Sequence, residues 1–242
     1  MRMNPLIQFM KQVQGKINSS VYASLQGQSS PQHVAFLRQL EKELKVEESL
    51  VVPLKELNVV VFDLETTGFF PEQGDEILSI GAVKVRGGVV QQEETFYSLA
   101  RCNRELTPEI KVLTGIEECD VETAPELSKV LVDFYDFVKG AVLVAHHASH
   151  EKKFLQHYNW KLFRSQFKHR IVDTSFLLRI AEPNVSLVRL EDCCDHCGIP
   201  VVDRHHALGD AKMTAELWSM YVERIQALGM KNLRDVYEKL SR

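Results

Sequence analysis

The spacing of hydrophobic residues changes along the chain and divides it into two parts. Over residues 5–17 and 33–45 apolar positions recur at helical spacing, and the Ser-, Gln- and Gly-rich stretch between them predicts a loop. A mostly polar stretch follows Pro53, so we expect a boundary there. The pattern predicts an N-terminal helical extension over residues 1–52, which packs on the main domain or on a protein partner, and a main domain over residues 53–242.

The main domain begins with strand-like patterns and continues with alternating helices and strands. Runs rich in β-branched and apolar residues predict strands from Val59 to the turn-forming TTG and at 77–85, 89–99 and 141–146. Gly87 and Gly88 predict a hairpin turn between two of them. Amphipathic spacing predicts helices at 126–140, closed by Gly140, and at about 150–160, 174–180, 186–195, 206–227 and 231–240. This order predicts an α/β fold with a mixed sheet flanked by helices.

Composition narrows the class of protein. The 242 residues suit one substantial domain with an appendage, and no apolar run approaches the roughly 18 residues of a membrane span. The N-terminus shows no signal-peptide pattern, and five cysteines, an odd number, are typical of free thiols in a reducing cytoplasm. The net charge of −4 disfavours nonspecific coating of nucleic acid but is compatible with carboxylates that collect divalent cations.

Acidic residues at the end of the first predicted strand are the first candidate chemistry. Side chains alternate along a strand, so Asp63 and Glu65 share one face. Two neighbouring acids repel each other, and a strand that holds them often offers them to a cation, although a solvated strand end is the commoner explanation of a bare pair. His205 and Asp210 open the predicted helix at 206–227, and Glu151 follows a cluster of histidines.

Three segments, in this order, resemble the three motifs of the DEDDh (DnaQ-like) 3′–5′ exonuclease family: FDLETTG (62–68), AHHASHEKKFL (145–155) and HHALGDA (205–211). In these motifs the chain is similar to the proofreading epsilon subunit of bacterial DNA polymerase III. Further segments that are similar to family elements are LTPEIKVLTGI (106–116), VDTSFLL (172–178) and SLVRLEDCCDHCGIP (186–200). A single D-x-E pair is weak evidence, whereas the ordered set is specific.

The resemblance implies an RNase H-like fold, with a mixed five-stranded sheet and helices on both faces. It also implies the stepwise release of nucleoside monophosphates from a nucleic acid 3′ end with two Mg²⁺ or Mn²⁺ ions. Asp63 would bridge both ions, Glu65 and Asp210 would complete one, and Glu151 would serve the other. His205 would be the base that takes a proton from the attacking water. Carboxylates suit this role because hard cations prefer oxygen ligands.

The second motif departs from the family pattern H-N-A-x-F-D, since this chain reads HHASHE at 146–151. His147 stands for Asn, His150 for Phe and Glu151 for Asp, while His146 matches a position that usually lies behind the ligands. We therefore expect no histidine metal site, with a direct His ligand for a softer metal as the alternative. Glu151 reaches about 1 Å farther than Asp would. We expect retained activity with a stronger preference for Mn²⁺, and loss of the second metal is the alternative.

Several residues are candidates for contact with the substrate. By the resemblance they are Thr66, Thr67, Gly68, Leu113, Thr114, His146, His150 and Phe154. Phe69 and Phe70, which follow the first motif, could also wedge against a terminal base. For both phenylalanines, and for Leu113 and Thr114, plain packing is an equal alternative.

Residues 152–170 carry six Lys or Arg and no acid, interleaved with aromatic residues. In an acidic chain this segment could steer a phosphate backbone and stack bases. The alternative is a helix with Phe154, Leu155 and Tyr158 in the core and a solvated basic face. The CCDHC segment at 193–197 could suggest zinc, but consecutive helical positions point apart, so buried thiols are expected.

Three functions remain open on the sequence alone. The first is a DNA 3′–5′ exonuclease that acts on single strands or 3′ ends in proofreading, repair or end trimming. The second is an RNA exonuclease of the same family, because the motifs are shared. The third is a binding module whose altered second motif has ended catalysis. The intact Asp63, Glu65, His205 and Asp210 favour an enzyme over the third function.

Overall fold

The computed structural model describes residues 49–241. The predicted helices at 5–17 and 33–45, with the loop between them, lie outside the described residues. Within residues 49–241, no helix is both long and apolar enough to cross a membrane. The domain boundary at residue 53 stays a prediction.

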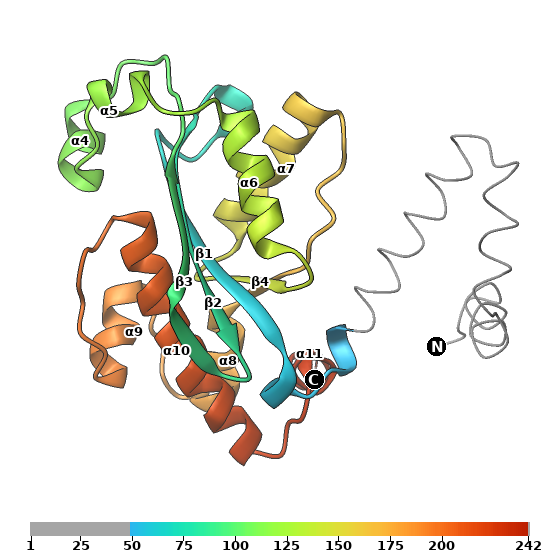
Figure 1. The fold of residues 1–242 in the computed structure, drawn as a ribbon. Helices are drawn as coiled ribbons and strands as arrows, with labels where there is room; N and C mark the ends of the chain where they lie inside the picture. Colours follow the sequence, from blue (N-terminus) through green and yellow to red (C-terminus); the bar gives the residue numbers. More distant parts are fainter. Residues whose placement is uncertain (1–48, 242) are drawn as a thin grey trace, which may run out of the picture. The chain divides into compact units, whose positions relative to one another are not determined.

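A five-stranded sheet in the order β3-β2-β1-β4-β5 forms the centre of the domain (Figure 1). The first three strands make an antiparallel meander: β1 (Asn58–Thr66), β2 (Ile77–Arg86) and β3 (Val89–Leu99). β4 (Val142–Ala145) lies parallel to β1, and β5 (Ile171–Asp173) lies parallel to β4. The prediction of a mixed five-stranded sheet is therefore confirmed. Gly87 and Gly88 make the hairpin turn with φ of +58° and +82°, a conformation that glycine adopts without steric cost.

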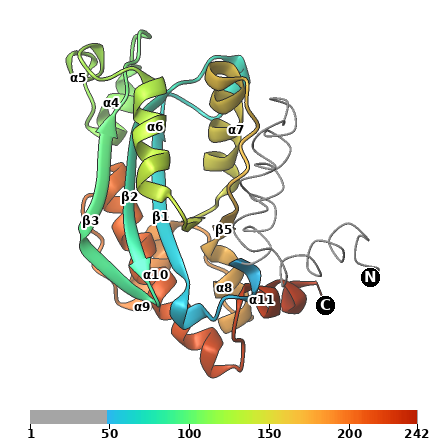
Figure 2. The ribbon, with the colours of Figure 1, turned by 45° about the vertical axis from the view of Figure 1, so that its right-hand side comes forward.

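Helices cover both faces of the sheet (Figures 1 and 2). On one face α6 (Leu127–Val138) and α7 (Ser149–Phe163) pack on Val60 and Phe62 of β1. On the other face α8 (Thr174–Ala181), α9 (Leu190–Cys197), α10 (Ala207–Ala227) and α11 (Leu233–Leu240) share a core with Val59 and Val61. The even-numbered side chains of β1 thus face α6 and α7, and the odd-numbered ones face α10.

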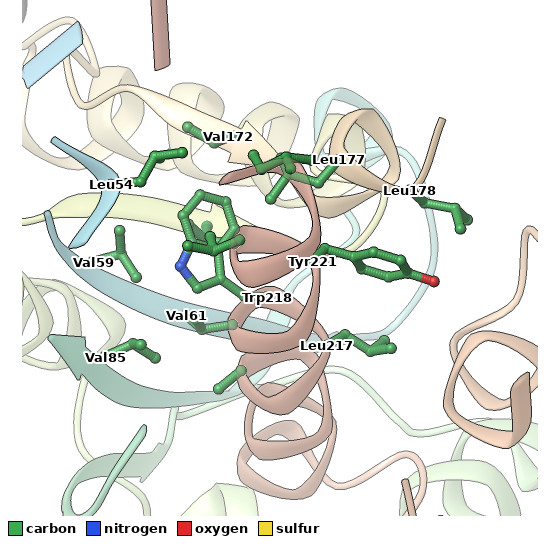
Figure 3. Close-up of a cluster of buried hydrophobic side chains, with 14 of the residues drawn as sticks. Leu54, Val59, Val61, Val85, Val172, Leu177, Leu178, Leu217, Trp218 and Tyr221 are labelled. Carbon is green, nitrogen blue, oxygen red and sulfur yellow. The ribbon is translucent and has the colours of Figure 1, made fainter. Parts of the chain in front are cut away.

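The larger core lies beneath α10 (Figure 3). Trp218 and Tyr221 of this helix are almost completely buried and pack with Val59, Val61 and Leu54. Removing one such aromatic side chain typically costs about 3–5 kcal/mol of stability. The core therefore fixes α10 firmly against the sheet, and the first turn of α10 is where Asp210 lies.

Short elements complete the domain between β3 and β4 or beside β1. α4 (Pro108–Thr114) and α5 (Glu118–Glu122) follow β3, and the 3-10 helices Leu54–Glu56 and Pro71–Gln73 flank β1. The sequence pattern predicted none of these, and it placed the start of α9 at residue 186. The structure begins α9 at Leu190, after a segment without helical structure.

Gly81 determines how closely α10 approaches the sheet. It pairs with Asp63 in the β1–β2 ladder, and a Cβ atom at this position would overlap the backbone of Ala207 and Leu208. The absence of a side chain therefore lets the first turn of α10 lie directly on β2. This contact places Asp210 beside Asp63.

Candidate active site

Three carboxylates from two elements meet at the end of β1. Asp63 and Glu65 lie on the odd-numbered face of β1, which faces α10, and Asp210 lies in the first turn of α10. One oxygen from each of the three lies within 4.8 Å of the other two, close enough to ligate a common cation. The pairing register shifts between Glu65 and Thr66, so β1 ends directly after the second acid. Such an irregularity is common where a strand presents functional side chains.

Glu151 is the fourth carboxylate of the cluster. It lies in the first turn of α7, which begins soon after β4 ends, and its side chain is only 4% exposed. Its charge raises the pKa values of both Asp63 and Glu65. The structure thus brings together all four acids that the sequence suggested, three as a tight trio and Glu151 beside them.

The four carboxyl groups destabilise one another in the charged form. Burial, followed by the charge of Glu151, raises the pKa of Asp63 well above its usual value. Burial and Asp210 raise the pKa of Glu65 to about 8, and burial and Asp173 raise the pKa of Glu151 to about 8. Burial also raises the pKa of Asp210 to about 6, although Arg204 opposes this shift. A cation among these groups would oppose every one of these shifts.

Two buried oxygens of the cluster have no hydrogen-bond partner within the described part of the chain: Oε2 of Glu151 and Oδ1 of Asp210. A buried carboxylate oxygen without a partner is costly, and a metal ion is one of the few groups that can satisfy it. The oxygen-only donor set matches the preference of Mg²⁺ and Mn²⁺. These residues therefore fit a divalent cation.

His205 lies next to the trio in a strained backbone conformation. Its φ of +63° is unusual for a residue other than glycine. Its backbone amide donates to Oδ2 of Asp210 at 3.3 Å, so the loop position depends on the carboxylate. Burial, and next the charge of Arg204, lowers the pKa of the imidazole. The ring is therefore neutral near pH 7 and able to accept a proton.

Arg204 is a charged residue of the site that the sequence reasoning missed. Its guanidinium pairs with Asp210 and also with Glu191 of α9, the latter at 3.1 Å. The available signal was a cation directly before His205. However, only the three-dimensional packing shows that the side chain turns back toward Asp210.

The histidines of the second motif bind protein groups. Nδ1 of His146 lies 2.9 Å from the hydroxyl of Thr174, and Nε2 lies 2.9 Å from the carbonyl oxygen of Val188. Nε2 of His147 lies 2.5 Å from the same carbonyl oxygen. Both rings thus connect the turn after β4 to the loop before α9. His150 takes another direction, with Nε2 3.3 Å from the hydroxyl of Thr66.

Asp173 holds the turn that contains these histidines. Its two carboxylate oxygens accept hydrogen bonds from the backbone amides of His147, Ala148 and Ser175 at 3.2, 3.0 and 2.9 Å. A carboxylate that accepts several amide bonds rigidifies the segment around it. Asp173 thereby fixes the start of α7, and with it the position of Glu151.

The candidate substrate contacts after β1 form an ordered turn. The hydroxyl of Thr66 donates to the carbonyl oxygen of Gly68 at 2.8 Å, and the hydroxyl of Thr67 accepts the amide of Glu76 at 2.9 Å. Phe69, directly after the turn, is 70% exposed and stacks edge-on with His150 at 5.6 Å. Thr66, Gly68, His150 and Phe69 therefore form one surface beside the carboxylates.

For two other candidates the structure favours packing. Phe154 is completely buried with Leu155 and Tyr158, because α7 turns these positions toward the sheet. The prediction that Phe154 contacts substrate is corrected accordingly, since its ring lies in the core. Thr114 is also buried and donates its hydroxyl to the carbonyl of Ile110, whereas its neighbour Leu113 is 47% exposed.

The cysteine-rich segment packs in the core beneath α9. Cys193 and Cys194 are buried, as expected for thiols that act as small hydrophobic groups. His196 pairs with Glu182 at 2.6 Å, and Sγ of Cys197 lies 3.3 Å from the hydroxyl of Tyr221. All five cysteines are free thiols.

Comparisons with known proteins show the family of the chain and agree with its fold. A family model described as "Exonuclease" (RNase_T) matches residues 60–218. A DNA polymerase III PolC-type protein of Caldanaerobacter subterraneus is 34% identical over 177 residues, which are 73% of this chain and 12% of that protein. A DNA polymerase III subunit epsilon-like protein of Rhodobacter capsulatus is 36% identical over 180 residues, which are 74% of this chain and 25% of that protein. The chain thus spans a quarter or less of the length of these relatives.

A solved structure, Exonuclease X in complex with 5′ overhanging duplex DNA, shares the fold. The two structures superpose with a TM-score of 0.56 at 22% identity. The matched residues make up 74% of this chain and 98% of the Exonuclease X chain.

Proposed function

Since this chain belongs to the RNase T exonuclease family, with DnaQ-like relatives of the polymerase III epsilon type, we propose that it is a 3′–5′ exonuclease acting on DNA 3′ ends. The observation that carries the proposal is the cluster of Asp63, Glu65, Asp210 and Glu151, with two buried oxygens that lack partners within residues 49–241. Such a cluster is costly to fold unless it binds cations, and the family activity requires them.

The residues of the site take distinct roles in this proposal. Two Mg²⁺ or Mn²⁺ ions would be held by Asp63 in common, by Glu65 and Asp210 at one position, and by Glu151 at the other. Bound there, the ions supply positive charge that stabilises the attacking and leaving oxygens of phosphodiester hydrolysis.

His205 would take the proton of the attacking water, a task that needs the neutral ring, and its lowered pKa favours that form. The hydrogen bond from its amide to Asp210 keeps the base next to the carboxylates. The turn at Thr66, Thr67 and Gly68, with His150, would position the terminal nucleotide. His146, whose two ring nitrogens lie against Thr174 and Val188, would support the turn after β4 from behind. Burial of Glu151 in a water-poor position strengthens its interaction with a cation.

The names of two relatives refer to DNA polymerase III, which favours DNA over RNA as the substrate. Proofreading, repair or end trimming would be the setting. Five free thiols support a reducing, cytoplasmic compartment. Residues 1–52, for which the hydrophobic pattern predicts a helical extension, would bind a protein partner.

The test is a digestion assay with the purified full chain. Labelled 3′-recessed, blunt and single-stranded DNA, and RNA of the same sequences, are incubated in Mg²⁺ and separately in Mn²⁺. We expect ladders that shorten from the 3′ end, an absence of products with Asp63→Ala, and normal products with Asp136→Ala, an exposed acid of α6. Faster digestion of RNA than of DNA would assign the RNA exonuclease function instead. A wild-type protein without activity in either metal would contradict the catalytic proposal.

A further inference from the structure

α7 presents a stripe of cationic and aromatic residues on the side away from the sheet. The α7 stripe consists of Lys153, His157 and Trp160, at spacings of four and three residues on one helix face, and of Arg164, which directly follows the helix with a φ of +50°. Trp160 is 58% exposed, Lys153 and Arg164 are exposed as well, and His157 is half-buried between them. Phe154, on the buried face of the helix, supplies the packing against the sheet, so packing does not explain the stripe.

The charge of this surface is opposite to that of the whole chain. The net charge of the chain is −4, yet residues 152–170 contain six cations and no acid. Within residues 49–241, no ion pair holds Lys153, Lys161 or Arg164, whereas Arg101 and Arg104 elsewhere pair with acids. Unpaired cations around an exposed indole suit a chain of phosphates with stacked bases.

The α7 stripe is continuous with the candidate active site. α7 begins at Ser149, so that Glu151 lies among the carboxylates and His150 contacts Thr66, while the stripe runs from there toward the far end of the helix. Nζ of Lys153 lies 5.3 Å from the ring centre of Phe70. The hydroxyl of Tyr158 donates to the carbonyl of Asp75 at 2.8 Å, which fixes α7 to the turn after β1.

We propose that the α7 stripe binds the single-stranded nucleotides that precede the 3′ end of the substrate. Lys153 and Arg164 would contact phosphates, with Lys161 at the flank, and Trp160 would stack on a base. From Lys153 to Phe163, the last residue of α7, the helix rises about 15 Å, which matches roughly four to five stacked nucleotides at about 3.4 Å each, and Arg164 follows directly. This inference rests on the proposed exonuclease function, which supplies the strand and its direction.

The experiment compares two double variants of the full chain. Lys153→Gln/Arg164→Gln removes two cations of the stripe, and Lys139→Gln/Arg179→Gln removes two exposed cations elsewhere. Each is assayed on single-stranded DNA of about two nucleotides and of about ten nucleotides, a difference that only an extended binding surface would detect. Binding of the longer strand is also measured by fluorescence anisotropy with EDTA present, so that it does not depend on turnover.

We expect the stripe variant to raise KM for the longer strand roughly tenfold and to leave hydrolysis of the dinucleotide unchanged. The slope of log Kd against log salt should fall by about 1.4, since each phosphate contact on a single strand contributes about 0.7. Trp160→Leu should weaken binding of the longer strand roughly five- to tenfold, with no change in the salt slope. The control variant should match the wild type.

Equal losses on the two lengths, or unchanged binding and salt slope, would overturn the proposal and would leave an acidic protein as the candidate partner of this surface. Because binding is measured in EDTA, a chain without exonuclease activity still tests the stripe. A failure of the proposed function is therefore distinguishable from a failure of this inference.

Discussion

The backbone amide of His205 donates to Oδ2 of Asp210 at 3.3 Å, so the candidate base and a candidate metal ligand are held together by the chain itself. His205 also adopts a φ of +63°, a conformation that asparagine tolerates better than most residues. Replacement of His205 by asparagine therefore removes the imidazole ring and keeps the backbone conformation of the loop.

We expect His205→Asn to lower kcat about 100- to 10,000-fold, the usual contribution of a general base, with KM little changed. Steady-state digestion of a single-stranded oligonucleotide measures both constants. His206→Asn is the matched control, because His206 is the adjacent histidine and stacks on Tyr97 at 4.5 Å, outside the carboxylate cluster. An equal loss of kcat in the two variants would show that His205 is not the base.

The stability of the metal-free protein should fall as the pH rises. The pKa values of Glu65 and Glu151 are raised to about 8 and that of Asp210 to about 6. Between the usual carboxyl pKa near 4 and pH about 8, the folded state therefore holds protons that the unfolded chain has released. In this window the free energy of unfolding decreases with pH, and metal ions that bind the charged form should offset the decrease.

Thermal unfolding in EDTA and in Mg²⁺, at several pH values across that window, measures this effect. We expect Mg²⁺ to raise Tm more at the alkaline end, where it no longer competes with protons. Glu65→Gln should flatten the pH dependence in EDTA. A Tm that rises with pH in the metal-free wild type would show that burial and mutual repulsion do not raise the pKa values of these carboxyl groups.

Glu151 should set the metal preference. Its carboxylate is nearly buried, and Oε2 has no protein partner within residues 49–241. Since its arm is about 1 Å longer than that of aspartate, we expect the wild type to prefer Mn²⁺, the more tolerant ion, and Glu151→Asp to reduce the ratio of Mn²⁺ to Mg²⁺ rates. Glu151→Gln, which keeps the shape but removes the charge, should lose activity in both metals. If Glu151→Asp leaves the ratio of Mn²⁺ to Mg²⁺ rates unchanged, Glu151 does not set the metal preference.

Asp173 should stabilise the second motif through three amide hydrogen bonds. Asp173→Asn turns one acceptor oxygen into an NH₂ group that faces an amide, so we expect a loss of about 1–3 kcal/mol in the free energy of unfolding. Urea unfolding measures the loss, and Asp192→Asn, an exposed acid that pairs with Arg189, is the control. Activity should fall as well, because Glu151 loses its fixed position. A variant as stable as the wild type would mean that the turn after β4 is held by other contacts.

Most parts of the fold that the sequence predicted have enough residues to show a period, and the four-residue β4 was predicted from its continuous apolar run. The β1–β3 meander, its Gly87-Gly88 turn and the long α10 were all clear from alternation or helical spacing. β5 has three residues and α5 has five, which is too short for any period to appear. These short elements are stabilised by tertiary contacts that a local pattern does not contain.

The residues of the candidate site also divide into those that the sequence predicted and those that it did not. The four carboxylates and His205 lie in motifs at fixed spacing, so the sequence located them. Arg204 was missed because its role depends on the direction in which a loop side chain turns. Phe154 was placed at the substrate because a resemblance assigns a position to a motif, whereas burial depends on the register of the whole helix.

The spacing of the carboxylates depends on a backbone contact between β2 and α10 at Gly81. It does not depend on the identity of most side chains around the cluster. Two backbones meet there, and backbone atoms are the same in every sequence. Core residues of α10 such as Leu217 can therefore change over evolutionary time, at similar volume, while Asp63 and Asp210 keep their separation. Distant lineages could diverge across both faces of the sheet and still inherit one spacing of ligands, as long as no side chain appears at position 81.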